Sequence, residues 1–429
     1  MPNDFLPDHP SRYALVNELH ARPFPVLRVP CLAAYIAIKE PESAHNRDRA
    51  ADRAHLLALL DRHGSAHPQP GATHFSGEIG RAGLKWESHT EFVTYSAFTP
   101  GLTPRAFDPA EAEVFPADWL AAAPGRRLVS VLIRVEPMPP SHAEALAKLD
   151  DWFVAESLAL SEVVDGAAII AGDFRIDAGG HMRFAVFVRD GVGERRVGRI
   201  VQRLCEVETY RAMSMLGLSR ARELSGRLNA LDPRLSALVA ALDTRDRSPE
   251  ALLEDLLDIS AELEALSARF TFRFGATAAY EAIVSQRVSV MREERIDGRQ
   301  TFGEFMMRRY DPAMRTVKST EERLKAMTER AARAAELLRT RVDVERSAQN
   351  QRLLESMDRR ADLQLRLQHT VEGLSVVAIS YYAVSLAAYA AYPLGKAAGL
   401  SKEMLTAALV LPVIGGVWLM IRRIRRAMH

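Results

Sequence analysis

The chain has 429 residues, and its 56 Lys and Arg against 55 Asp and Glu leave a formal net charge of +1. This length suits two or three structural units, and the near balance of charge excludes a nucleic-acid binder that works by bulk electrostatic attraction. The only cysteines, Cys31 and Cys205, belong to no CxxC pair or histidine cluster. A disulfide framework or a zinc site of standard spacing is therefore not expected, and both cysteines are predicted to be core residues.

Residues 1–190 have mixed α and β character and are predicted to form a cytoplasmic α+β domain. Helices are predicted from apolar spacing at 46–64, where Gly64 suits a left-handed C-terminal cap, and at 140–157. A Gly-rich turn at 177–181 predicts an antiparallel hairpin between the last two strands. The predicted strands are "LRVPCLAAYIAI" (27–38), "GLKWESHTEFVTYSAF" (83–98), "RLVSVLIRV" (127–135), "GAAIIAGDFRID" (166–177) and "HMRFAVFVRD" (181–190).

From residue 191 onward the pattern is helical, which predicts a helical domain over 191–312 and a long stalk helix over 313–370. The only proline of this stalk region, Pro312, lies in its first turn, so one helix is expected to continue unbroken into the next segment. Apolar residues recur at seven-residue spacing, and the register weakens at Glu345 before a similar spacing returns. The first set is Val317, Leu324, Ala331 and Leu338, and the second is Leu354 and Ala361.

Two apolar segments at the C-terminus, 371–395 and 404–421, are long enough to be transmembrane helices. The residues 396–403 between them form a short outer loop, and 422–429 a basic cytoplasmic tail. By the positive-inside rule, both the N-terminus and the C-terminus are expected to be cytoplasmic. The arginines that support this orientation are Arg359, Arg360 and Arg366 before the first span, and Arg422, Arg423, Arg425 and Arg426 after the second.

Hydroxyl-bearing residues form a stripe on the first of these helices. Their steps of seven, three, four and three residues place them on one helical face, and such a face should point into an assembly rather than toward lipid. Either the stripe is a helix interface with an interfacial tyrosine belt, or it lines a pore. The stripe consists of Ser375, Tyr382, Ser385, Tyr389 and Tyr392, whereas Ser380, Tyr381, Ala387, Ala388 and Ala391 lie off it.

The order of an N-terminal α+β domain, a helical stalk, two spans with a short outer loop and a basic tail resembles the CorA-type magnesium transporters. In that family the first span lines the pore of a pentamer, and a Gly-Met-Asn motif at its outer end recognises the hydrated cation. The corresponding residues here are 392–395, "YPLG", and no Gly-Met-Asn occurs in the loop. The resemblance implies a cation channel with an altered outer motif. A divalent cation is expected as a bound ion only if the chain is such a channel.

Four strings carry a closer resemblance, to the bacterial domain-of-unknown-function family 3422 of predicted membrane-anchored proteins. It implies no established activity, and it places the chain at the bacterial inner membrane. The strings are "NELHARPF" (17–24), "KWESHTEFVTYSAF" (85–98), "LLRTRVDVERSAQNQRLLESM" (337–357) and "QLRLQHTVEGLSVVAISYYAV" (364–384).

Two short stretches bring together side chains that can transfer protons or bind a metal. Were 83–98 a single strand, Glu87 and His89 would share one of its faces, although a solvated sheet face accounts for the same alternation. The sequence "GVGERRVG" (191–198) lacks the spacing of a dinucleotide fingerprint and is expected to be a helix start. The candidate polar site is Glu18, His20, Arg22, Glu87 and His89.

Three functions remain open. The first is a membrane-anchored, homo-oligomeric scaffold or regulator that faces the cytoplasm, with a lipid bilayer and a cytoplasmic protein as candidate partners. The second is a CorA-like cation channel. The third is a membrane-tethered enzyme, for which the sequence contains no HExxH, nucleophile elbow or phosphate-binding loop. No cofactor and no nucleic-acid partner are predicted.

Overall fold

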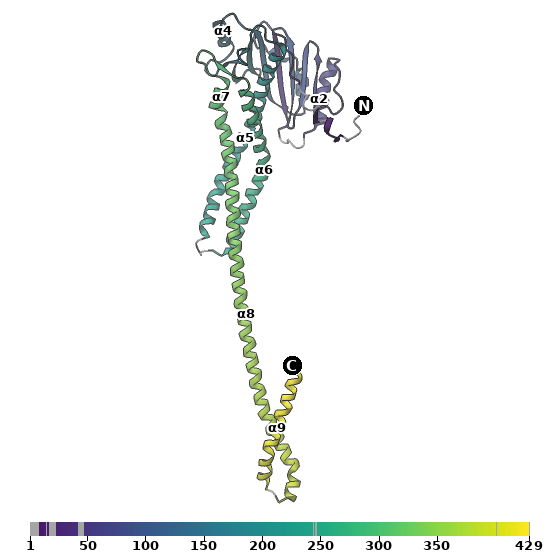
Figure 1. The fold of residues 1–429 in the computed structure, drawn as a ribbon, viewed down its shortest axis with the longest axis vertical. Coiled ribbons are helices and arrows are strands. Elements are labelled where there is room, and N and C mark those ends of the chain that lie inside the picture. The colour runs from purple at the N-terminus through teal and green to yellow at the C-terminus, as the bar shows by residue number, and fades with distance from the viewer. Residues whose placement is uncertain are drawn as a thin grey trace. The chain divides into compact units, whose positions relative to one another are not determined.

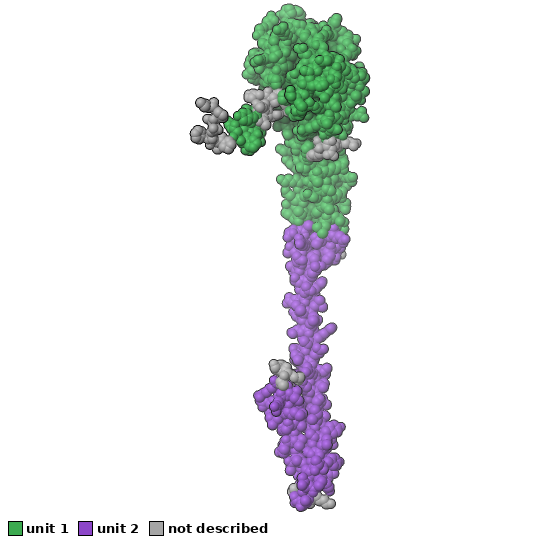
Figure 2. Space-filling model, turned by 90° about the vertical axis from the view of Figure 1, so that its right-hand side faces the viewer, with its two compact units in different colours: residues 1–243, 255–334 green, residues 244–254, 335–429 purple. Residues whose placement is uncertain are grey.

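The computed structural model describes residues 8–13, 15–16, 23–41, 47–242, 244, 247–399 and 401–428. Two compact units are present, one of residues 1–243 and 255–334 and the other of residues 244–254 and 335–429 (Figure 2). The first unit contains the sheet and the helices that cover it (Figure 1). The mixed α+β domain followed by a long helical region, as predicted, is confirmed.

The described strands form one nine-stranded sheet in the order β2-β3-β4-β1-β5-β8-β7-β6-β9. Every pairing between them is antiparallel except that of β5 with β8. Their bounds are β1 Cys31–Lys39, β2 His74–Ile79, β3 Ala82–Ser88, β4 Phe92–Pro100, β5 Arg126–Pro137, β6 Ala159–Val163, β7 Ala168–Ile176, β8 Met182–Val188 and β9 Glu294–Arg295.

The predicted β7–β8 hairpin is confirmed, with Asp177 N–H donating to the His181 carbonyl at 2.9 Å and Gly180 at φ +82°. The single strand predicted over 83–98 is wrong, because these residues contribute to the antiparallel pair β3 and β4. The turn between the strands contains no glycine or proline, and His89 N–H closes it by donating to the Phe92 carbonyl at 2.9 Å. The strands β2, β6 and β9 were not predicted, and β9 lies in the region that was expected to be helical throughout.

One face of the sheet is covered by α2 (Arg49–Arg62), α3 (Ala117–Ala121) and α4 (His142–Trp152). The Asp48 side chain caps α2, and Gly64 beyond its end takes the predicted left-handed conformation at φ +61°. The ring of His55 stacks on Trp119 with their centroids 4.0 Å apart, inside the core. An apolar and aromatic layer therefore fills the space between this face of the sheet and its helices.

The other face is covered by α5 (Glu194–Ala241), which contacts β1, β5 and β8. The Tyr35 hydroxyl meets the Thr209 hydroxyl at 2.7 Å across this interface. Residues 191–198 are the start of α5, as expected, with Gly193 as the N-cap. A side chain at Gly198 would place its Cβ 1.7 Å from the Pro25 carbonyl oxygen, so this position requires glycine for close approach of two backbones.

Two more long helices complete the helical part of the first unit, α6 (Pro249–Ser289) and the first turns of α8 (Asp311–Ala397), with the short α7 (Phe302–Arg309) before α8 (Figure 1). Asp232 on α5 accepts from Arg323 of α8 at 3.0 Å and from Arg330, and Arg269 of α6 donates to Glu223 of α5 at 2.7 Å. Of the seven-residue series, Val317, Leu324 and Ala331 are buried in this unit.

The second unit is built from the rest of α8, from α9 (Lys402–Met428) and from residues 244–254. The helix α8 is continuous for 87 residues, so the prediction of an unbroken helix is confirmed. The C-terminal part of α8 and α9 are both long and apolar enough to cross a membrane. Within this unit Gly395 packs closely on Leu405, because a Cβ at Gly395 would lie 3.0 Å from the leucine side chain.

Two glycines of α5 give a matched test of this packing. The change Gly198→Ala should lower stability by about 1–3 kcal/mol, because the added methyl collides with the Pro25 carbonyl. On the same helix, a Cβ at Gly226 would meet no atom within 4 Å, so Gly226→Ala should raise stability by about 0.5–1 kcal/mol through helix propensity. Thermal unfolding midpoints of the two variants measure both effects, and equal shifts would contradict the close approach at Gly198.

Candidate functional site

A cavity of about 230 Å³ lies between the sheet and the helices α5 and α6. Strands β1, β3 and β4 supply one side, and α5 supplies most of the other. All of its lining belongs to the first unit. The lining residues are Phe24, Tyr35, Lys85, Glu87, His89, Phe92, Ser96, Phe98, Gln202, Cys205, Glu206, Thr209, Tyr210 and Arg287.

Secondary-structure periodicity explains how these side chains converge. Side chains two residues apart in a strand point to the same side of the sheet, which brings Lys85 and Glu87 of β3 to the cavity together. In α5 the lining residues Gln202, Glu206 and Thr209 follow helical spacing, so they share the face that lies over the sheet.

A chain of polar contacts crosses the cavity wall from the sheet to α6. The Lys85 ammonium lies 3.3 Å from a Glu87 carboxylate oxygen and donates to the Gln202 amide oxygen at 2.9 Å. The Gln202 amide nitrogen donates to Glu206 at 2.7 Å, and Arg287 donates to the other oxygen of Glu206. The Lys85 side chain is 6% exposed and that of Glu87 is 14% exposed. The wall thus presents two formal positive and two formal negative charges, of which Lys85 and Glu87 are mostly desolvated and Arg287 is 32% exposed.

Next to the cavity, Glu91 joins the β3–β4 turn to α6. It is 2% exposed, accepts from Arg273 and from the Tyr280 hydroxyl at 3.0 Å, and lies 3.8 Å from the Lys39 ammonium. Burial lowers the pKa of Lys39 and raises that of Tyr280, with nearby Glu91 adding to the increase for Tyr280. This cluster fixes the turn that holds His89.

The structure places the predicted polar residues unevenly. Glu87 and His89 both line the cavity, but His89 lies in the turn after β3, with its ring stacked on Phe92 at 4.4 Å between centroids. The prediction that they share a strand face is therefore corrected. Glu18, His20 and Arg22 lie outside the described residues. Phe24, which ends the string "NELHARPF", lines the cavity.

Sequence reasoning missed Lys85, Gln202, Glu206 and Arg287. Lys85 and Gln202 are separated by 117 positions, and Glu206 and Arg287 by 81. No local spacing connects such residues, because only the packing of α5 and α6 on the sheet brings them together. The one available signal was the presence of charged residues in otherwise apolar segments of a strand and a helix.

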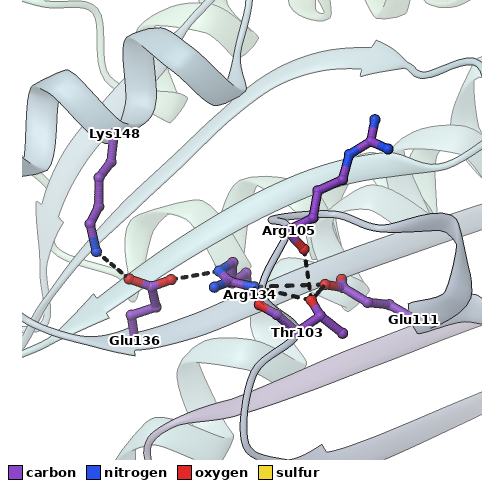
Figure 3. Close-up of polar contacts among 6 residues, drawn as sticks. All are labelled: Thr103, Arg105, Glu111, Arg134, Glu136 and Lys148. Atoms are coloured by element: carbon purple, nitrogen blue, oxygen red, sulfur yellow. Dashed lines mark hydrogen bonds and ion pairs between the residues drawn. The ribbon is translucent and has the colours of Figure 1, made fainter.

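A second buried polar cluster, also missed, lies on β5 near α4 (Figure 3). Arg134 donates to Glu136 at 2.5 Å and lies 3.7 Å from Glu111, and Lys148 donates to the second oxygen of Glu136 at 2.6 Å. Burial raises the pKa of Glu111. Burial also acts to raise the pKa of Glu136, but the adjacent Lys148 and Arg134 outweigh it and lower this pKa. Thr103 also bonds to Glu111. The cluster connects the loop after β4 and α4 to the sheet, which is a structural role.

The cavity wall offers ion-pairing and hydrogen-bonding groups of both charges. Among the described residues, no group of three or more His, Cys, Asp or Glu side chains is placed to hold a metal ion. Burial keeps the Cys205 thiol protonated by raising its pKa. Ser130 and His181 form a hydrogen bond of 2.7 Å, but both are buried outside this cavity, and burial lowers the pKa of His181.

The hydroxyl stripe lies in the second unit and is only partly covered by α9. Ser385, Tyr389 and Tyr392 border a hollow of about 430 Å³ together with Lys402 and Thr406 of α9. Ser375 and Tyr382 are exposed. Off the stripe, Ser380 and Gly395 are buried and Ala387 and Ala391 partly buried, so small residues provide the closest contacts of this hairpin.

The two cysteines provide a test of burial in the first unit. Burial raises the pKa of Cys31 to about 12 and that of Cys205 still further, so at pH 8 fewer than about one thiol in a thousand is ionised. Both thiols should therefore remain unmodified by Ellman's reagent over minutes in the native full-length protein, and both should react after denaturation. Rapid labelling of either thiol in the native protein would show that its surroundings are open.

The comparisons with known proteins give a family and no activity. No curated protein matches the chain. The family model described as "Protein of unknown function (DUF3422)" matches residues 7–428, which is nearly the whole sequence. The chain therefore belongs to the DUF3422 family of proteins of unknown function.

Proposed function

We propose that the protein is a membrane-anchored, self-associating scaffold of the bacterial inner membrane, with its α+β domain in the cytoplasm. The two apolar helices at the C-terminus support the anchor, and the arginines that precede the first and follow the second support the cytoplasmic orientation of both ends. The observation that carries self-association is the bare surface of α8 in the second unit.

Residues 346–371 of α8 are exposed on every side of the helix. Large apolar side chains on this segment are more than half exposed, which is unusual for a helix that remains alone in water. They are Leu353, Leu354, Met357, Leu363, Leu365, Leu367 and Val371. Such a segment requires a partner along its length.

The spacing of the exposed face supports a second copy of this chain as the partner. Leu354, Met357 and Ala361 begin an alternation of three and four residues, the repeat of helices that supercoil around one another. The same alternation continues without a break into the hydroxyl stripe, through Gln364, Gln368, Val371, Ser375, Ala378, Tyr382, Ser385, Tyr389 and Tyr392. A partner that matches this face both outside and inside the membrane must itself be anchored and parallel, and a second copy satisfies this in register.

The two seven-residue series of α8 have separate roles in this proposal. The first series ends with the buried Leu338, and its next positions are Glu345, Arg352 and Arg359, which are polar. The series from Leu354 therefore begins a new face, which the protomer leaves exposed from residue 354 to residue 382. Leu353, Leu365 and Leu367 flank this face and widen it, which favours more than two helices in the assembly.

A second candidate, conduction by a CorA-like assembly, is favoured by one observation: Ser375 and Tyr382 of the stripe are exposed in the protomer and would face a central axis. The contacts of the serines favour a sealed interface instead. Ser375 and Ser385 donate to the carbonyls of Val371 and Tyr381 at 2.8 and 2.9 Å, so these hydroxyls are satisfied within the helix without pore water.

Cysteine cross-linking tests the self-association face. With both native cysteines replaced by alanine, Leu354→Cys and Ala361→Cys should each give covalent oligomers with a short bismaleimide in native membranes, because both lie on the shared face. Arg359→Cys, on the opposite side of the same helix, is the matched control and should remain monomeric on a denaturing gel. Equal cross-linking at all three positions, or none at any, would refute this face.

The stripe distinguishes a sealed interface from a pore. In the assembled protein, Tyr382→Cys should resist a charged, membrane-impermeant methanethiosulfonate reagent, because a packed interface excludes water. Ala398→Cys, in the outer loop, is the accessible control and should react when the reagent is applied from outside. Rapid modification of Tyr382→Cys from the aqueous side would support conduction in place of the sealed scaffold.

A further inference from the structure

The cavity between the sheet and α5 has the features of a ligand site that the scaffold proposal does not use. We infer that it binds a small zwitterion with an apolar group, of the kind represented by a free aliphatic α-amino acid. This inference is independent of membrane anchoring and self-association, because every lining residue lies in the first unit.

The size of the cavity limits the ligand. Its volume of about 230 Å³ is below the range of about 300–1,000 Å³ that is typical of sites for drug-sized molecules and cofactors. This volume suits a molecule the size of an amino acid and is small for a nucleotide or a flavin. Phe24, Phe92 and Phe98 give part of the lining an aromatic surface that suits an aliphatic group.

The charges of the wall select for a dipolar ligand. Lys85 and Arg287 are balanced by Glu87 and Glu206, so the wall is formally neutral before any ligand arrives. A buried net charge on the ligand would remain uncompensated, which is costly in a desolvated site. A zwitterion adds no net charge and can direct its carboxylate to a cation of the wall and its ammonium to an anion.

The wall also retains hydrogen-bond donors and a hydrogen-bond acceptor for a ligand. An ammonium group has three donors, and among the described residues Lys85 directs its ammonium at two partners, Glu87 and Gln202. A guanidinium has five donors, and Arg287 uses its Nε on Glu206 and one Nη on the adjacent Gln286. On the acceptor side, the ion-pair partner of Glu87 within the described part of the chain is Lys85, through one carboxylate oxygen. Donors and an acceptor are thus available to both ends of a zwitterion.

Two other buried clusters, around Glu136 and Glu91, lack this property. In the cluster on β5 both oxygens of Glu136 are occupied, one by Arg134 and the other by Lys148. Both oxygens of Glu91 are likewise occupied, by Tyr280 and by Arg273. These two clusters are closed networks that connect elements of the fold, whereas the wall of the cavity borders an open volume.

Isothermal titration calorimetry of the full-length protein in detergent micelles tests the inference with L-alanine, L-valine and L-leucine as probes. At least one of them should bind with a dissociation constant below about 1 mM. The deaminated acid and the decarboxylated amine of the best probe should each bind at least tenfold more weakly, because each lacks one of the two charges. Failure of all three amino acids to bind, or equal binding of either analogue, would overturn the inference.

Two variants assign the binding to this cavity. Glu87→Gln preserves the shape of the wall but removes the carboxylate that retains an acceptor oxygen for the ligand ammonium, and it should weaken binding of the best probe at least tenfold. Lys85→Met should do the same, and its thermal unfolding midpoint reports whether it still folds. Lys148→Met, which removes a lysine from the cluster outside the cavity, is the matched control and should bind as the wild type does. Unchanged binding in Glu87→Gln would place the ligand elsewhere and refute the assignment.

Discussion

The helix α5 packs both on the sheet and among other helices, and most of the first unit depends on this double packing. Its 48 residues correspond to about 72 Å of helix, whereas β5, with 12 residues, is about 40 Å long. Only its N-terminal part, with the buried Val197, Val201 and Leu204, can therefore lie on the sheet. The remainder, with Leu228 and Leu235, is buried among helices instead. Gly198 is the point at which α5 comes closest to the chain that leads into β1.

The interface between α5 and the sheet is apolar over β5 and β8 but charged over β3. Paired buried charges contribute little net stability, because loss of hydration offsets most of their attraction, while removal of one partner costs about 3–5 kcal/mol. A purely structural interface would be served equally well by apolar residues. Lys85 and Glu206 each form an ion pair with a different residue beside the open cavity. Ligand binding therefore explains these charges more readily than folding does. Glu91, enclosed by its partners, keeps the adjacent turn in place.

Sequence patterns predicted those features whose causes are local. The turn at 177–181, the cap at Gly64 and the continuous helix after Pro312 each depend on residues a few positions apart, and each is present. The division of 83–98 into two strands was missed because the turn residues His89, Thr90 and Glu91 carry none of the usual turn chemistry. The cavity was predicted only in part: Glu87 and His89 were recognised as candidate site residues because they are close in sequence. Their partners on α5 and α6 were not, because tertiary packing alone brings them near.

A comparison of the free energies of apolar burial and of association supports the proposed self-association of the stalk. Burial of a large apolar side chain contributes about 1.5–3 kcal/mol, so the six exposed on residues 353–367 represent about 9–18 kcal/mol for each chain. Association of free molecules costs about 4–15 kcal/mol in lost translational and rotational freedom. In the proposed assembly, anchoring in one membrane would remove part of that freedom in advance and fix the helices parallel, which lowers this cost without changing the contacts. The gain from burial is then sufficient for association even if only part of each apolar side chain is covered. In the same proposal, the hydroxyl stripe further along this face does not have to drive assembly and only continues the register of the stalk into the bilayer.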